Sequence, residues 1–174
     1  MLVLRTCNAD LTSHGRFKWP ASGPVSAPDW NGQPDCGGGL HGLPWGEGDG
    51  ELLNWDESSK WLVVEVADTC LCFERKCKFP RGIVVYSGDR LGATAYLAAN
   101  GGFGRAIVGG LITAGDGGTA TAGDRGTLII RRWDYSADRW RISIGYIGED
   151  GLLAGVKYRL TDAGRFELVT EGAV

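Results

Sequence analysis

The chain has 174 residues, which is enough for one domain with an appendage and enough to bury a hydrophobic core. Its 18 Lys and Arg stand against 21 Asp and Glu, and the resulting formal charge of −3 argues against nucleic acid or an anionic membrane as a partner. Seven Trp and a hydrophobic fraction of 43% exclude a disordered or collagen-like chain. No apolar run reaches the roughly 18–20 residues of a membrane helix, so we expect a globular protein without a membrane segment.

Glycine is in excess, with 29 copies where an average chain of this length would hold about 12. Ten lie within residues 1–50 and ten within residues 101–126. The excess therefore belongs to two separate regions, and the segment between them has an ordinary globular composition.

The first hundred residues predict strands, one long loop region and one helix. Residues 8–50 are rich in Gly, Pro, Ser and Asp, but three interspersed Trp favour an ordered loop region. The helix should begin after Asp89, a favourable N-cap, and end before Gly101 and Gly102. The predicted strands are residues 2–7, 16–19, 61–66 and 83–86, and the predicted helix is residues 90–99.

Five cysteines, an odd number, are typical of free thiols in a reducing compartment. The apolar part of residues 1–7 is too short for a signal peptide, so these two features together predict a cytoplasmic protein. Cys70, Cys72 and Cys77 lack the two-residue gap of a zinc knuckle, and no other Cys or His pair completes four ligands. We expect Cys70 and Cys72 to share one face of an extended strand, with no metal and no cofactor bound.

An eight-residue repeat begins at Gly110. The segments 110–117 and 118–125 are close copies, and a third copy begins at Gly126. Because the period is even, equivalent positions keep the same face of a strand from copy to copy. Gly-Asp-Gly and Gly-Asp-Arg-Gly supply corners, since glycine accepts a positive φ. One face holds Ile112, Ala114, Ala120, Ala122, Leu128 and Ile130, and the other holds Thr113, Thr119, Thr121 and Thr127.

Strand and corner at a fixed period predict a short β-solenoid stacked on the globular core. The alternative is a pair of ordinary β-hairpins with Gly-Asp turns, because about three stacked units are normally needed for an independent solenoid. Residues 139–146, 156–160 and 165–169 predict further strands that cap the stack, with a turn at 162–164. The predicted class is mainly β (α+β): an N-terminal α+β domain over residues 1–101 with one helix, a short octad β-solenoid over 102–133, and a C-terminal β-hairpin cap over 134–174.

The octads and the segments 145–151 and 157–160 resemble an uncharacterised family of phage and prophage proteins. Its members carry an amino-terminal domain with a Cys followed by Gly-Leu-His, and arrays of Ala-Thr-Ala-Gly octads. Here that signature is Cys36-Gly-Gly-Gly-Leu-His41. The octads are also similar to the water-ordering repeats of ice nucleation proteins, although this array is short and lacks regular threonine ladders. The resemblance implies a phage origin and an architecture, and no established activity.

The first glycine-rich region holds the candidate site. Cys36 and His41, five residues apart, are candidates for a thiol and imidazole that act in catalysis. Trp45 could stack on a planar ligand, and Arg5 and Arg90 could meet an anion, Arg90 at the start of the helix. We favour a role in shaping a ligand site over catalysis, because a loop His often only holds its loop in place. The predicted ligand-binding residues are Arg5, His41, Trp45 and Arg90.

These observations predict a phage-derived, non-enzymatic binding protein. Its ligand would be a small nucleotide-like molecule or a host defence signal, or its partner a host protein, and the solenoid would serve as scaffold or as a surface for homo-oligomers. The first alternative is a small enzyme that uses Cys36 and His41 on a nucleotide-like or acyl substrate. The second alternative is a virion decoration or adhesin component.

Overall fold

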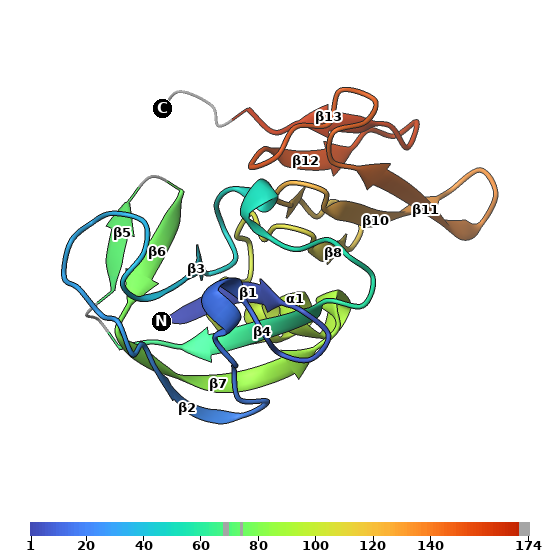
Figure 1. The fold of residues 1–174 in the computed structure, drawn as a ribbon. Helices are drawn as coiled ribbons and strands as arrows, with labels where there is room; N and C mark the ends of the chain where they lie inside the picture. Colours follow the sequence, from blue (N-terminus) through green and yellow to red (C-terminus); the bar gives the residue numbers. More distant parts are fainter. Residues whose placement is uncertain (68–69, 74, 171–174) are drawn as a thin grey trace. The chain divides into compact units, whose positions relative to one another are not determined.

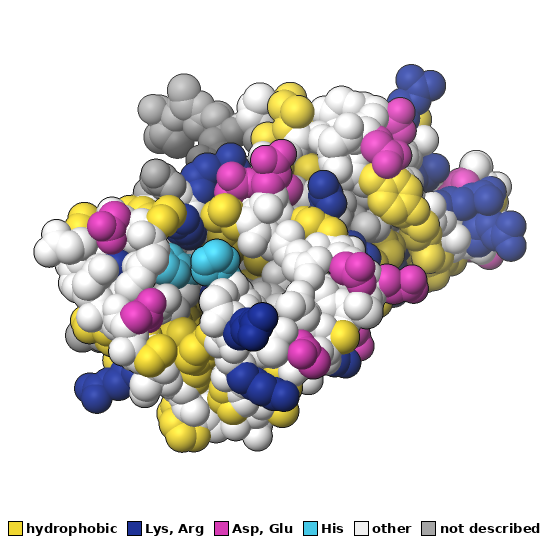
Figure 2. Space-filling model, viewed as in Figure 1, with side chains coloured by type: hydrophobic (Ala, Val, Ile, Leu, Met, Phe, Trp, Pro, Cys, Tyr) yellow, Lys and Arg dark blue, Asp and Glu magenta, His cyan; other side chains and the backbone are white. Residues whose placement is uncertain are grey.

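The computed structural model describes residues 1–67, 70–73 and 75–170, and it divides into two compact units, Met1–Phe103 and Gly104–Val174 (Figure 1). We call them the N-terminal unit and the C-terminal unit. The protein is mainly β, and α1 is the single α-helix of the described residues. Figure 2 shows Lys and Arg side chains interspersed with Asp and Glu on the face that it draws, as the small net charge predicts.

The N-terminal unit is built on a seven-stranded sheet of the described residues, in the order β2-β7-β4-β1-β3-β6-β5, and neighbouring strands are antiparallel. The strands are β1 (Leu2–Cys7), β2 (Gly23–Ser26), β3 (Leu40–Pro44), β4 (Lys60–Glu65), β5 (Leu71–Phe73), β6 (Lys76–Phe79) and β7 (Arg81–Gly88). Two short 3-10 turns, η1 (His14–Arg16) and η2 (Gly50–Leu52), lie between strands.

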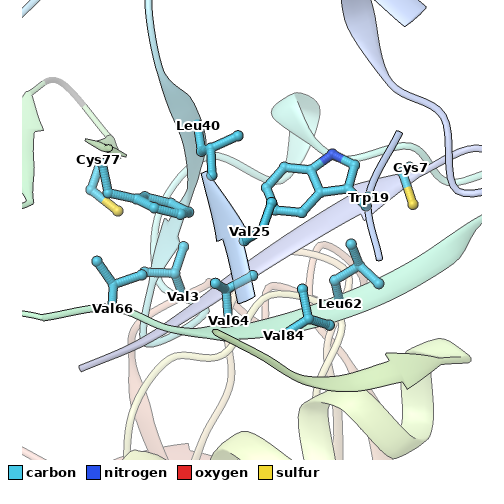
Figure 3. Packing of buried hydrophobic residues seen from close by; sticks show 11 residues of the cluster. Val3, Cys7, Trp19, Val25, Leu40, Leu62, Val64, Val66, Cys77 and Val84 are labelled. Atoms are coloured by element: carbon cyan, nitrogen blue, oxygen red, sulfur yellow. The ribbon is translucent and has the colours of Figure 1, made fainter. Parts of the chain in front are cut away.

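The central strands of this sheet are buried on both faces, which explains the unbroken apolar run of β4. Leu62 and Val64 of β4 belong to a core cluster that includes Trp19 and Val25. Figure 3 shows the Trp19 ring and Val25 lying against side chains from β1, β4 and β7. On the alternate positions Trp61 and Val63 are also buried, and α1 (Arg90–Leu97) packs against β4 and β7.

The helix begins as predicted and ends two residues earlier. The Asp89 carboxylate accepts a hydrogen bond from the Gly92 amide at 2.8 Å, which confirms Asp89 as the N-cap. The helical turns continue into a wider turn, η3 (Ala98–Gly102), in which Gly101 has a φ of 106°. Only glycine adopts such a φ at little cost, so the chain leaves the helix there.

The predicted strand at residues 16–19 is wrong. Gly15 and Arg16 have φ values of 68° and 60°, which place them in the turn η1 rather than in an extended strand. An isolated bridge between Thr12 and Lys18 is the β-pairing of this segment. Conversely, β3 lies inside the region that was predicted to be a loop. Its sequence does not indicate a strand, because it carries two Gly or Pro residues and shows no clear alternation.

The C-terminal unit contains two three-stranded sheets of the described residues, β11-β10-β8 and β13-β12-β9. In the first sheet β8 and β10 are parallel, and Leu111 pairs with Thr127, sixteen residues further on. The other pairs of both sheets are antiparallel. The strands are β8 (Leu111–Ala114), β9 (Ala120–Thr121), β10 (Thr127–Asp134), β11 (Arg139–Tyr146), β12 (Lys157–Leu160) and β13 (Phe166–Leu168).

The two faces predicted for the octads are the faces that the structure has. Ala120, Ala122, Leu128 and Ile130 are buried in a core cluster, and Ile112 and Ala114 pack against it. Thr113 and Thr119 are exposed, and Thr121 and Thr127 are half-buried. The even period of the repeat therefore predicts correctly which side chains form the core.

No helix in the part of the chain that the structure describes is long and apolar enough to cross a membrane.

Candidate functional site

The N-terminal unit has a pocket of about 570 Å³ where the first glycine-rich region meets β1, β3 and β6. Both histidines of the chain line it, and Figure 2 shows them close together on the surface. The pocket lies beside the point where β1 and β3 stop pairing after Val3 and Leu4. It is lined by Arg5, Ser13, His14, Gly15, Phe17, Trp19, Pro28, Asp29, Cys36, Gly37, Gly38, Gly39, Leu40, His41 and Lys76.

A buried lysine holds the glycine-rich wall of this pocket in place. Lys78 of β6 is fully buried, and its ammonium donates to Asn31 Oδ1 at 2.5 Å, to the Gln33 carbonyl at 2.9 Å and to Asp35 Oδ1 at 3.1 Å. The Trp30 ring lies over the same ammonium, 5.7 Å from centroid to Nζ. One satisfied charge thus organises the segment from residue 30 to residue 35.

The glycines that follow are required by the geometry. Gly38 has a φ of 56°, and a Cβ there would lie 2.2 Å from the Asn31 amide nitrogen. At Gly39, with a φ of 156°, a Cβ would touch Lys78 and Trp30 at 3.0 Å. Both positions therefore exclude side chains, and the backbone itself forms this part of the pocket wall.

Arg5 of β1 is a half-buried cation with one buried, unsatisfied nitrogen. Its guanidinium lies over the Trp19 ring at 4.5 Å, and its Nη1 donates to the His41 carbonyl at 2.8 Å. Its Nε is buried and has no hydrogen-bond partner. Burial lowers the pKa of Arg5 to about 10, since desolvation disfavours the charged form.

His41 of β3 also has an unsatisfied ring nitrogen. Its Nε2 is buried without a hydrogen-bond partner, and the ring packs edge-on against Phe73, with centroids 6.2 Å apart. Burial lowers the pKa of His41, and the positive charges of Lys76, Arg5 and Lys78 lower it further. The neutral imidazole is therefore favoured in the folded protein.

Cys36 contacts a lysine rather than the imidazole. Lys76 Nζ donates to Cys36 Sγ at 2.8 Å, and the same ammonium lies 5.3 Å from the centroid of the Phe73 ring. Because His41 Nε2 has no partner, it does not receive the thiol proton. The structure thus brings Arg5, Cys36 and His41 to one pocket, without forming the thiol–imidazole hydrogen bond that nucleophilic activation needs.

The structure places Trp45 and Arg90 elsewhere in the N-terminal unit. The Trp45 ring lies beside Gly101, where a Cβ would be 3.2 Å from it. Arg90 lines a separate cavity of about 370 Å³ with Trp55, Asp56 and Glu57. The Gly92 amide at this helix start already donates to the Asp89 carboxylate, so fewer free backbone amides remain to bind an anion.

Two lysines at this site were not predicted from the sequence: Lys76, which lines the pocket, and Lys78, which holds its glycine-rich wall. The two lysines alternate with Cys77 in the sequence Lys76-Cys77-Lys78. This alternation of charged residues on a strand was the pattern that could have indicated them. Within the described residues, no group of three His, Cys, Asp or Glu side chains is placed to hold a metal ion. Cys70, which precedes β5, and Cys72 of β5 have their sulfurs 3.9 Å apart.

Comparison with known proteins gives two results. A family profile described as "Domain of unknown function (DUF7666)" matches residues 1–99. Ice nucleation proteins of Xanthomonas campestris pv. translucens and Pseudomonas syringae are 40% and 38% identical over 103 and 101 residues, which are 58% and 56% of this chain but only 7% and 9% of those proteins. Ice nucleation protein InaU of Pantoea ananas is 36% identical over 100 residues, 56% of this chain and 10% of the relative. No solved structure matches the chain.

These relatives confirm the likeness of the octads to ice-nucleation repeats and correct two predictions, that of the function and that of the location. The predicted phage-derived binder of a nucleotide-like molecule or a host defence signal is wrong, because the relatives are ice nucleation proteins. The enzyme and virion alternatives gain no support from them. The cytoplasmic prediction, which rested on the cysteine count and the first residues, is overturned by the same relatives.

The chain spans no more than a tenth of the length of these relatives, whereas the family profile covers more than half of the chain itself. This protein therefore belongs to the family defined by the domain of unknown function DUF7666.

Proposed function

We propose that the C-terminal unit is the closing coil of an octad β-solenoid of the ice-nucleation type, and that it ends such a stack rather than nucleating ice alone. The observation that carries this proposal is the parallel pairing of β8 with β10 at a distance of sixteen residues. Sixteen residues are two octads, so one octad would form each half of a coil.

The corners of the chain support the same period. The Gly123 amide donates to the Ile107 carbonyl, sixteen residues earlier, at 3.1 Å. The Gly109 amide donates to the Asp124 carbonyl at 2.8 Å, so the corner before β8 lies against the corner before β10. A Cβ at Gly123 would be 2.3 Å from the Ala106 carbonyl oxygen, which is why this corner is glycine.

The strands after β10 close one side of the stack. β11 pairs antiparallel with β10 over eight residues, from Thr127↔Tyr146 to Asp134↔Arg139. β12 pairs antiparallel with β9, and β13 continues that sheet. A further coil cannot add beside β10, which is paired on both sides, or on the side of β9 that β12 occupies.

The side of β8 away from β10 remains an edge within its own sheet. Ile112 and Ala114, the inward residues of β8, are only half-buried, whereas the equivalent Leu128 and Ile130 of β10 are buried. A coil added beside β8 would complete their burial and increase the stability of the stack.

A role in ordering water is suggested only by the relatives, and it would require many repeated coils. A surface that templates ice needs a regular array, and one coil, residues 111–126, presents the exposed Thr113 and Thr119 once. The ice nucleation proteins that this chain matches are at least ten times longer than the matched segment. We therefore expect ice nucleation to grow with the number of coils and to be absent from this chain alone.

The experiment inserts one, two or four copies of residues 111–126 after Gly110. Whole-coil insertions should keep the fold and raise the thermal midpoint, and the temperature at which droplets freeze should rise with copy number. The matched control inserts a single octad, residues 119–126, which moves the corner at Ile107 to the opposite side of the coil and should destabilise the unit.

Two results would contradict the proposal. If one octad is tolerated as well as two, the coil does not have a sixteen-residue period. If the unmodified chain freezes droplets at the same temperature as the variant with four copies, the closing unit itself nucleates ice and does more than end a stack.

A further inference from the structure

The pocket beside Arg5 combines positive charge with buried nitrogens that lack partners. Arg5 and Lys76 bring two cations to its lining, and Asp29 is the one carboxylate among the described residues that line it. Arg5 Nε and His41 Nε2 are both buried and unpaired. Buried polar nitrogens without partners are unfavourable, so a site that holds two of them beside a pocket is suited to a ligand that supplies oxygen atoms.

We propose that this pocket of the DUF7666 domain binds a small oxyanion, which accepts hydrogen bonds from Arg5 and Lys76. This inference is independent of the proposed role of the C-terminal unit. Arg5 lines the pocket, and its Nη1 is held by the His41 carbonyl, so the guanidinium is already oriented while other N–H groups of it remain for a ligand. Guanidinium and ammonium groups form the strongest hydrogen bonds with anionic oxygens, because both partners are charged.

The glycine-rich wall leaves room for such a ligand. Gly37, Gly38 and Gly39 line the pocket and have no side chains to fill it. The volume of about 570 Å³ exceeds that of a bare ion, and Phe17 adds an aromatic wall. The oxyanion is thus either a free ion or the head group of a small organic molecule, and both share the same recognition by Arg5 and Lys76.

Lys76 has an alternative partner when no anion is present. Its ammonium donates to Cys36 Sγ at 2.8 Å, and an anion in the pocket would compete with this thiol for the ammonium. Cys36 is exposed, so its reactivity reports on the site. Binding should change the rate at which iodoacetamide alkylates Cys36, which peptide mass spectrometry separates from the other four cysteines.

The site should also take up a proton with the anion. The groups around His41 are Lys76 and Lys78 from β6, Arg5 from β1, the Asp35 backbone and the Phe73 ring, and Asp29 lies in the same lining. The three cations lower the pKa of His41, and a bound anion would offset them. Binding should therefore raise the pKa of His41 and grow stronger as the pH falls.

The test measures binding of sulfate, phosphate and phenyl phosphate to the whole chain by calorimetry and thermal shift, at constant ionic strength set with chloride. Lys76→Gln removes one charge at a partly exposed position and should weaken binding by about tenfold, as expected for one charge-assisted hydrogen bond. Arg81→Gln removes an exposed charge of β7 outside the pocket and should leave binding within about twofold.

Sulfate carries the pH arm of the test because its charge is constant near neutral pH. Its affinity should rise from pH 8 to pH 5.5, and the NMR titration of His41, assigned with His14→Gln, should move to higher pH when sulfate is added. Tighter binding of phenyl phosphate than of phosphate would identify the anion as a head group, and equal binding would identify a free ion. No binding to the folded chain, or equal loss in the Lys76→Gln and Arg81→Gln variants, would overturn the proposal.

Discussion

The two glycine-rich regions of this protein hold ten glycines each, but the glycines are there for different physical reasons. In residues 30–39 the glycines follow a segment that a single side chain, Lys78, holds through three hydrogen-bond acceptors. In residues 107–126 they sit at corners that backbone hydrogen bonds connect about sixteen residues apart. The conformation of the first region therefore depends on the hydrogen bonds of one side chain, and that of the second on backbone hydrogen bonds between successive corners.

This difference explains why the first region is the better place for a site. A repeated coil satisfies its own backbone groups and offers the same surface at every turn. An aperiodic loop fixed by one buried charge can hold groups in arrangements that no repeat produces, such as Arg5 Nε and His41 Nε2 beside one pocket. The following predictions test whether the two regions really differ in this way.

The largest effect should come from Lys78→Met. The substitution leaves Asn31 Oδ1, the Gln33 carbonyl and Asp35 without the ammonium, and we expect a loss of about 3 kcal/mol of unfolding free energy. Urea unfolding and hydrogen exchange over residues 30–39 measure the loss. The matched control is Lys76→Met on the same strand, whose partly exposed ammonium should contribute less than about 1 kcal/mol. Equal losses in the two variants would show that the loop does not depend on Lys78.

A smaller effect should separate two glycines that occupy the same position in successive octads. At Gly123 a Cβ would lie 2.3 Å from the Ala106 carbonyl oxygen, whereas at Gly115 nothing lies within 4 Å. We expect Gly123→Ala to lower the unfolding free energy by about 1–3 kcal/mol and Gly115→Ala to change it by less than about 0.5 kcal/mol. Thermal and urea denaturation of both variants provide the measurement. Similar values for the two would mean that the corners do not stack as described.

The smallest effect should be the pH dependence that His41 adds to stability. Burial lowers the pKa of folded His41 below its ordinary value of 6.5, so the unfolded chain binds the proton more readily. Stability from this group should be constant above pH 6.5 and should fall as the pH drops below that value. His41→Gln should reduce this slope in unfolding free energy between pH 7 and pH 5.5. A slope that is unchanged by His41→Gln would contradict the burial of this imidazole.

Much of the fold could be predicted from the chain's local patterns. The apolar run of β4, the N-cap at Asp89 and the inward parity of the octads follow from propensity and periodicity, which act over a few residues. The turn at residues 162–164 was also predictable, and Gly164 has the positive φ that it requires. The strand predicted at residues 16–19 failed because Arg16 and the preceding Gly15 adopt left-handed φ values, which neither composition nor alternation indicates.

The candidate site could be predicted only in part. Arg5, Cys36 and His41 were named from their chemical types, and the structure does bring them to one pocket. Their partners were not predictable, because Lys76 and Lys78 lie far along the chain and meet Cys36 and Asn31 only when β6 pairs with β3. Trp45 and Arg90 lie elsewhere, since a residue type alone carries no information about which residues the sheet order makes neighbours.

By itself, the sequence determined the eight-residue period, the two faces of the octads and the place where the helix begins, because each depends on contacts between near neighbours. Only the tertiary structure decided that β8 and β10 pair in parallel, with Leu111 opposite Thr127 two octads further on. Only the tertiary structure decided that Lys76 rather than His41 contacts Cys36. Both depend on residues far apart in the chain, whose approach is set by strand order and by the burial of the core rather than by local pattern.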